Sequence, residues 1–98
     1  MFLRQNDKEY TDWSRKIKER DNYVCQICWR SGIPLNSHHL YSWDIFDGKR
    51  YDLNNGICLC SDCHILFHSI FGKGKNTPFQ FIEFKKSILA IKKAKGIK

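Results

Sequence analysis

Long apolar runs, proline and methionine are all scarce in this chain. Its 98 residues include two prolines and one methionine, and no stretch approaches the ~20 apolar residues of a membrane-spanning helix. The first seven residues, Met1 to Asp7, also lack the apolar run of a secretory signal. We therefore expect a soluble protein of the reducing cytoplasm, with no membrane partner.

Acidic residues are the minority among the charged ones. Ten Asp and Glu stand against 17 Lys and Arg, which gives a formal net charge of +7. Such an excess predicts a polyanionic partner, and nucleic acid is the first candidate. The lysine-rich stretch over residues 92–98 could equally serve only solubility.

Cysteine is the residue type whose spacing carries most information. A chain this short buries a limited core and often needs a metal or disulfides to hold it. Four of the five cysteines form two Cys-x-x-Cys pairs, which are Cys25 with Cys28 and Cys60 with Cys63. Two such pairs complete a tetrahedral zinc shell with no position left for water, so we expect a structural Zn²⁺, with redox chemistry as the competitor. Cys58 belongs to neither pair, and we expect it to be a small buried apolar residue.

The chain has no internal repeat and no low-complexity linker, which predicts one α+β domain over residues 1–98. Thr11 or Asp12 could cap a first helix, Ser61 a second that stops at Gly72, and Thr77-Pro78 opens a third. The expected order is helix, two-strand hairpin, helix, helix. The first half should contain a helix over 11–20, a β-prone zinc knuckle over 22–28 and an extended segment over 35–43. A loop over 46–52, a strand over 56–59, and helices over 61–71 and about 77–94 should follow.

All four histidines fall in two places, at His38 and His39 and at His64 and His68. His64 and His68 are four apart on the predicted helix, so both side chains can reach one ion. Neighbouring residues on a strand point to opposite sides, which favours a metal ligand and a general base at His38 and His39. A single histidine on a half-buried element is as often purely structural, and only the joint pattern favours chemistry.

These motifs together resemble the HNH endonuclease family. The segments that carry the resemblance are Arg20 to Cys28, Ser37-His38-His39-Leu40, Asn55 to Cys60, Cys63-His64 with His68, and Phe71 to Pro78. They follow the order used by the zinc-containing branch, and the last segment is similar to small HNH proteins of phages and mobile introns. The resemblance spans Trp13 to about Phe84. It implies a ββα-metal, treble-clef-like core over about 20–72, with flanking helices, in a bacterial or phage-infected cell.

The resemblance also implies a role for each residue of the motif. His39 would be the general base, and Asn55 would orient its ring. His38 and His64 would be ligands of a catalytic metal, and His68 matches a third ligand that many members lack. Because a histidine base must be neutral, activity should fall on the acid side of about pH 7.

The implied activity is metal-dependent hydrolysis of DNA, most simply of the double strand, to 5′-phosphate and 3′-hydroxyl ends. Magnesium, manganese, nickel or zinc could serve, and no organic cofactor is expected. The basic residues nearest the motif in sequence are Lys16, Lys18, Arg20, Lys49, Arg50, Lys73 and Lys75. The alternative is a basic zinc ribbon that binds nucleic acid without cutting it. A zinc domain for protein interaction would leave the positive charge without a reason.

Overall fold

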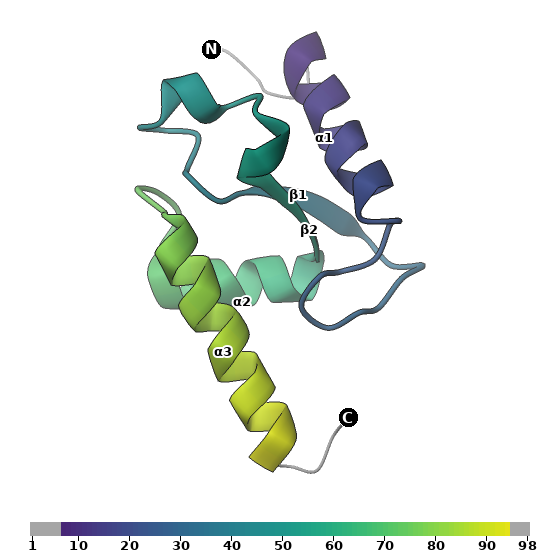
Figure 1. Ribbon diagram of the computed structural model, residues 1–98, viewed down its shortest axis with the longest axis vertical. Coiled ribbons are helices and arrows are strands. Elements are labelled where there is room, and N and C mark those ends of the chain that lie inside the picture. Colours follow the sequence, from purple (N-terminus) through teal and green to yellow (C-terminus); the bar gives the residue numbers. More distant parts are fainter. Residues whose placement is uncertain (1–6, 95–98) are drawn as a thin grey trace.

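A computed structural model describes residues 7–94 as an α+β domain built on one two-stranded sheet (Figure 1). Its elements are α1 (Lys8–Arg20), β1 (Leu35–His39), β2 (Gly56–Cys60), α2 (Ser61–Phe71) and α3 (Pro78–Ala94), with short 3-10 turns η2 (Asp47–Lys49) and η3 (Leu53–Asn55). The expected fold class and the two flanking helices are confirmed.

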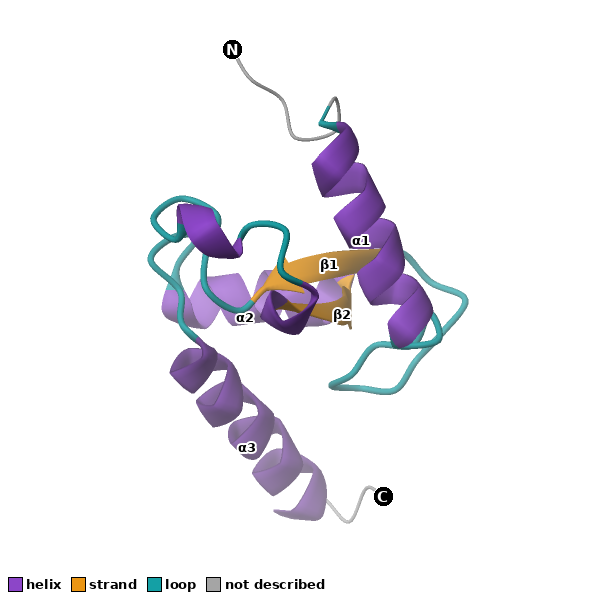
Figure 2. Ribbon diagram, turned by 45° about the horizontal axis from the view of Figure 1, so that its top comes forward, coloured by secondary structure: helices purple, strands orange, loops and turns teal. Residues whose placement is uncertain are grey.

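The sheet lies between two helices. Helix α1 packs on one face of the strands and α2 on the other, while α3 packs on α2 and extends away from the sheet (Figures 1 and 2). Trp13 and Ile17 of α1 form a small core with Cys58. A larger core on the α2 side is built around Phe67, Phe81 and the cysteines. Each face of β1 therefore meets a different helix.

Helix α1 begins one turn earlier than the sequence analysis predicted. Asp7 is its N-cap, since the Asp7 side chain accepts hydrogen bonds from the backbone N–H groups of Glu9 and Tyr10. Asp12, one of the two predicted caps, lies inside the helix and pairs with Lys8 at 3.0 Å. Asp7 lies about two turns before the buried residues Trp13 and Ile17. It is a better cap than Thr11 or Asp12, because its carboxylate satisfies two backbone N–H groups at once.

The strands also differ from the prediction. β1 and β2 pair antiparallel, with Leu35 opposite Cys60 and His39 opposite Gly56. The extended segment expected to reach Trp43 ends at His39, where the loop over 40–55 turns away. The zinc knuckle predicted over 22–28 consists of turns despite its β-prone residues, and Asn22 and Tyr23 take left-handed backbone conformations with φ of 57° and 55°. Turns there curl the chain around Cys25 and Cys28.

Helices α2 and α3 begin and end close to the predicted residues. α2 stops at Gly72, whose φ of 85° favours glycine, and α3 starts at Pro78. The N-cap of α2 is Cys60, not Ser61, since the Cys60 sulfur accepts from the Cys63 N–H at 3.4 Å. Within residues 7–94, no helix combines the length and apolarity needed to cross a membrane.

Candidate metal centres and active site

The four predicted zinc cysteines meet at one point. The sulfur atoms of Cys25, Cys28, Cys60 and Cys63 all lie within 4.8 Å of one another. The Cys28 and Cys60 sulfurs are 3.7 Å apart. Two thiolates bound to one tetrahedral zinc at about 2.3 Å would be about 3.8 Å apart, so the cluster has the dimensions of a zinc site.

Arg30, which the sequence analysis missed, covers this cluster. Its guanidinium donates to the Cys28 sulfur at 3.2 Å and to the Cys60 sulfur at 3.3 Å, and it pairs with Asp62 at 3.3 Å. Burial acts to raise the pKa of the Cys28 thiol, but hydrogen bonds from Arg30 and the neighbouring thiols outweigh it and lower that pKa to about 6. An arginine two residues after a Cys-x-x-Cys pair was the signal available in the sequence.

The second cluster joins three of the four histidines. Ring nitrogens of His38, His64 and His68 all lie within 4.8 Å of one another. The Nε2 atoms of His64 and His68 are 3.1 Å apart. Two imidazoles bound to one ion at about 2.0–2.1 Å, with an angle of about 90–109°, would hold their nitrogens about 2.8–3.4 Å apart. His68 Nδ1 donates to the Gly72 carbonyl at 2.7 Å, which leaves the Nε2 lone pair to face His64.

His38 shows most directly that this cluster fits an ion. The side chain is 2 % exposed, and within residues 7–94 its Nε2 atom has no hydrogen-bond partner. Burial, with a smaller effect from the neighbouring histidines, lowers the pKa of His38 to about 3, so the ring is neutral at physiological pH. A buried ring nitrogen without a hydrogen-bond partner is costly, and a metal ion bound to its lone pair would satisfy it.

His39 points to the opposite face of β1. Its ring stacks on Trp13 of α1 with centroids 3.9 Å apart and planes inclined by 12°, whereas the His38 ring packs against Phe67 of α2 at 4.6 Å. His39 Nε2 lies 2.8 Å from the Arg50 carbonyl oxygen. Because a carbonyl only accepts, His39 Nε2 carries the proton and Nδ1 has the lone pair needed by a base.

Asn55, which was predicted to orient the His39 ring, hydrogen bonds to the backbone next to the Arg50 carbonyl that His39 contacts. The buried Asn55 amide accepts from the Tyr41 N–H at 2.7 Å and donates to the carbonyls of Tyr41 and Lys49, each at 3.0 Å. It therefore fixes the backbone of the loop that presents the neighbouring Arg50 carbonyl to His39.

All four histidines line one pocket of about 560 Å³ at the end of the strands. Residues of α1, α2 and the loops over 40–46 and 72–76 complete its wall. Lys73 is the one residue of the seven basic candidates that lines it. The pocket thus brings together a three-nitrogen cluster, a histidine with a defined tautomer, and a cation.

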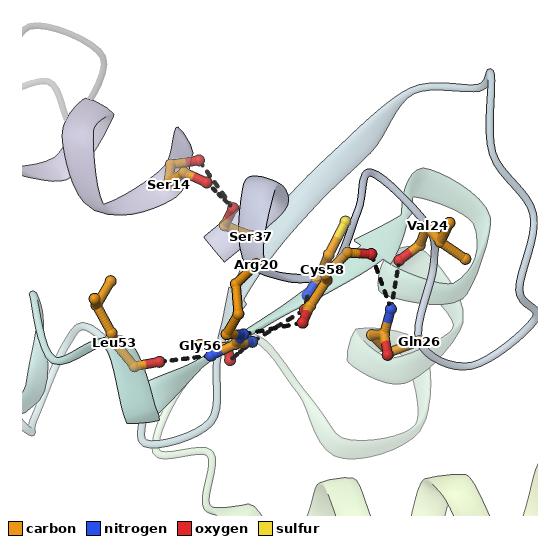
Figure 3. A network of polar contacts seen from close by, with 9 residues as sticks. Ser14, Arg20, Val24, Gln26, Ser37, Leu53, Gly56 and Cys58 are labelled. Carbon is orange, nitrogen blue, oxygen red and sulfur yellow. Dashed lines mark hydrogen bonds and ion pairs between the residues drawn. The ribbon is translucent and has the colours of Figure 1, made fainter. Parts of the chain in front are cut away.

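Both arginines among the basic candidates have internal partners. Arg20 pairs with Asp21 and donates to the carbonyls of Leu53 at 2.8 Å and Gly56 at 2.7 Å (Figure 3). Arg50 donates to the Trp43 carbonyl at 2.9 Å, stacks over the Trp43 ring at 4.5 Å, and pairs with Asp47 at 3.3 Å. These contacts give both arginines a structural role.

The sheet consists of two antiparallel strands, and α2 follows β2 directly. The histidine cluster lies between β1 and α2. This arrangement is a ββα-metal core. The family model described as HNH endonuclease matches residues 25–69. The chain belongs to this family. A curated relative, Anaredoxin of Nostoc sp. (strain PCC 7120), is 30% identical over 60 residues, which cover 61% of this chain and 76% of that protein. No solved structure matches the chain.

Proposed function

We propose that the protein is a metal-dependent endonuclease that hydrolyses phosphodiester bonds of double-stranded DNA. The proposal rests on one observation: side chains from both faces of β1 line the same pocket. The buried, unpartnered Nε2 of His38 belongs to a three-histidine cluster, and His39 stands on the other face with its tautomer set by the Arg50 carbonyl.

In the proposed reaction, His39 Nδ1 takes a proton from a water molecule. The water oxygen then bonds to phosphorus, and the bond from phosphorus to the 3′ oxygen breaks. The leaving oxygen takes a proton from solvent, which gives 5′-phosphate and 3′-hydroxyl ends. A divalent ion held by His38, His64 and His68 would stabilise the negative charge on the phosphate and on the leaving oxygen. Three imidazoles favour nickel or zinc over magnesium, which prefers oxygen ligands.

The charge distribution supports DNA as the substrate. The chain carries a formal net charge of +7, and Lys73 lies in the wall of the pocket where a phosphate would bind. Lys16, Lys18, Lys49 and Lys75 are the other lysines proposed to contact the DNA backbone. Contacts of this kind give affinity without much sequence readout.

The test is incubation of the zinc-loaded protein with supercoiled plasmid and each divalent metal in turn. We expect nicked or linear product with at least one added metal, and ends that DNA ligase rejoins without prior phosphorylation. A brief chelator treatment should stop cleavage, and added metal should restore it, with circular dichroism used to check that the fold survives. Folded protein that leaves the plasmid intact with every metal contradicts the proposal and supports the non-catalytic zinc ribbon.

The name of the relative favours a second candidate function, electron transfer. Anaredoxin ends in "redoxin", and a tetrahedral four-thiolate site can hold iron as well as zinc. Arg30 hydrogen bonds to two of the sulfurs would tune the potential of such an iron site. Elemental analysis separates the candidates, since the endonuclease should contain zinc at the cysteines, whereas an electron carrier should contain iron and absorb visible light.

A further inference from the structure

Trp13 lies outside residues 25–69, which match the family model, yet its side chain contacts His39, which lines the pocket. Helix α1 places the indole face to face with the His39 ring, at a centroid distance of 3.9 Å and an interplanar angle of 12°. Trp43 meets the same imidazole edge-on at 5.6 Å. The candidate base is therefore held between a helix and a loop, each of which contributes an aromatic ring.

The indole is itself firmly placed. Trp13 is 2 % exposed, and its ring N–H donates to the Asp52 carbonyl at 2.8 Å. Gly56 of β2 leaves the space that the ring occupies, since a Cβ atom at Gly56 would lie 2.5 Å from Trp13 Cζ2. The indole ring that stacks on His39 is thus fixed at its N–H edge by a hydrogen bond and at its carbon edge by packing on Gly56.

The stack and the hydrogen bond at His39 constrain different motions. The bond from His39 Nε2 to the Arg50 carbonyl fixes one ring atom, but the ring can still tilt about that atom. A stacked face fixes the plane of the ring. Together they determine where the Nδ1 lone pair points, and a base must point at its proton to work.

We infer that Trp13 is a positioning residue that holds the plane of His39 for proton abstraction. The inference rests on the proposed nuclease function. It makes α1 part of the active site, and it predicts that loss of the indole affects the rate of the chemical step more than DNA binding. A displacement of about 1 Å at a reacting group can cost about 100-fold in rate.

The experiment compares three variants in plasmid nicking at saturating metal. Trp13→Leu keeps an apolar side chain but removes the stacked ring, and Trp13→Phe keeps an aromatic face. Ile17→Ala is the matched control, because Ile17 is fully buried one turn further along α1 and its truncation loosens the same helix. For each variant kcat, KM for DNA and the melting temperature are measured.

We expect Trp13→Leu to lower kcat by about 10- to 100-fold with KM within about twofold of the parent. Trp13→Phe should recover most of this loss, and Ile17→Ala should keep its kcat at temperatures where it is folded. If Trp13→Leu and Ile17→Ala lose kcat equally, or if only KM changes, Trp13 is merely structural and the inference is wrong. If the folded parent protein leaves the plasmid intact with every metal, the proposed function has failed and takes the inference with it.

Discussion

Replacement of Gly56 by alanine tests how tightly α1 is seated against the sheet. The added Cβ would lie 2.5 Å from Trp13 Cζ2 and 2.7 Å from Ile17 Cδ1, well inside the ~3.5–4.0 Å at which carbon atoms attract. The Gly56 backbone has φ −141° and ψ 152°, which any residue adopts. The cost therefore comes from crowding and not from backbone strain.

Overpacking of this kind costs about 1–3 kcal/mol. We expect a loss of about 2 kcal/mol, which at an m-value of about 2 kcal/mol/M lowers the urea midpoint by about 1 M. The assay is urea unfolding followed by tryptophan fluorescence at a fixed excess of zinc. Gly48→Ala is the matched control, because a Cβ there meets nothing within 4 Å and should change stability by less than about 0.5 kcal/mol. Equal midpoints for the two variants would refute the packing argument.

Three further predictions concern zinc and DNA. Native mass spectrometry should find one tightly bound zinc at the cysteines. The Cys60→Ser variant should lose both the zinc and the fold, whereas Cys58→Ala should retain the metal. A Cys60→Ser protein that folds cooperatively without zinc would contradict this prediction. DNA affinity should fall steeply between low and moderate salt, and fluorescence anisotropy that barely changes would argue against a phosphate-binding surface. Arg20→Ala should lower the melting temperature, because it removes bonds to two carbonyls, while Lys73→Ala should weaken DNA binding at unchanged melting temperature.

The metal clusters are the features that the sequence predicted best. Two Cys-x-x-Cys pairs and two histidines four apart are local patterns whose spacing limits where the ligand atoms can lie. The structure brings the cysteines into one cluster and His38, His64 and His68 into another. The stop at Gly72 was predictable for the same reason, since it depends on the conformational freedom of a single residue.

Contacts between residues far apart in sequence were not predictable in this way. The stack of Trp13 on His39 and the bonds from Arg20 to Leu53 and Gly56 form only once α1 docks on the sheet. Charge placed Arg20 among the DNA-binding candidates, and that prediction stands untested, but a sequence does not tell which cations also donate to internal carbonyls. The hydrogen-bond partners of Asn55 were not predictable either, since they belong to a loop whose path no local pattern specifies.

The most direct test of the central claim is the cleavage rate of His39→Ala, measured with its affinity for DNA and for the catalytic metal. This variant removes the proposed base but none of the three clustered histidines. We predict a loss of plasmid nicking of about 10²–10⁴-fold at every metal concentration, with both affinities within about twofold of the parent. A His39→Ala protein that nicks plasmid at the parent's rate would contradict the account.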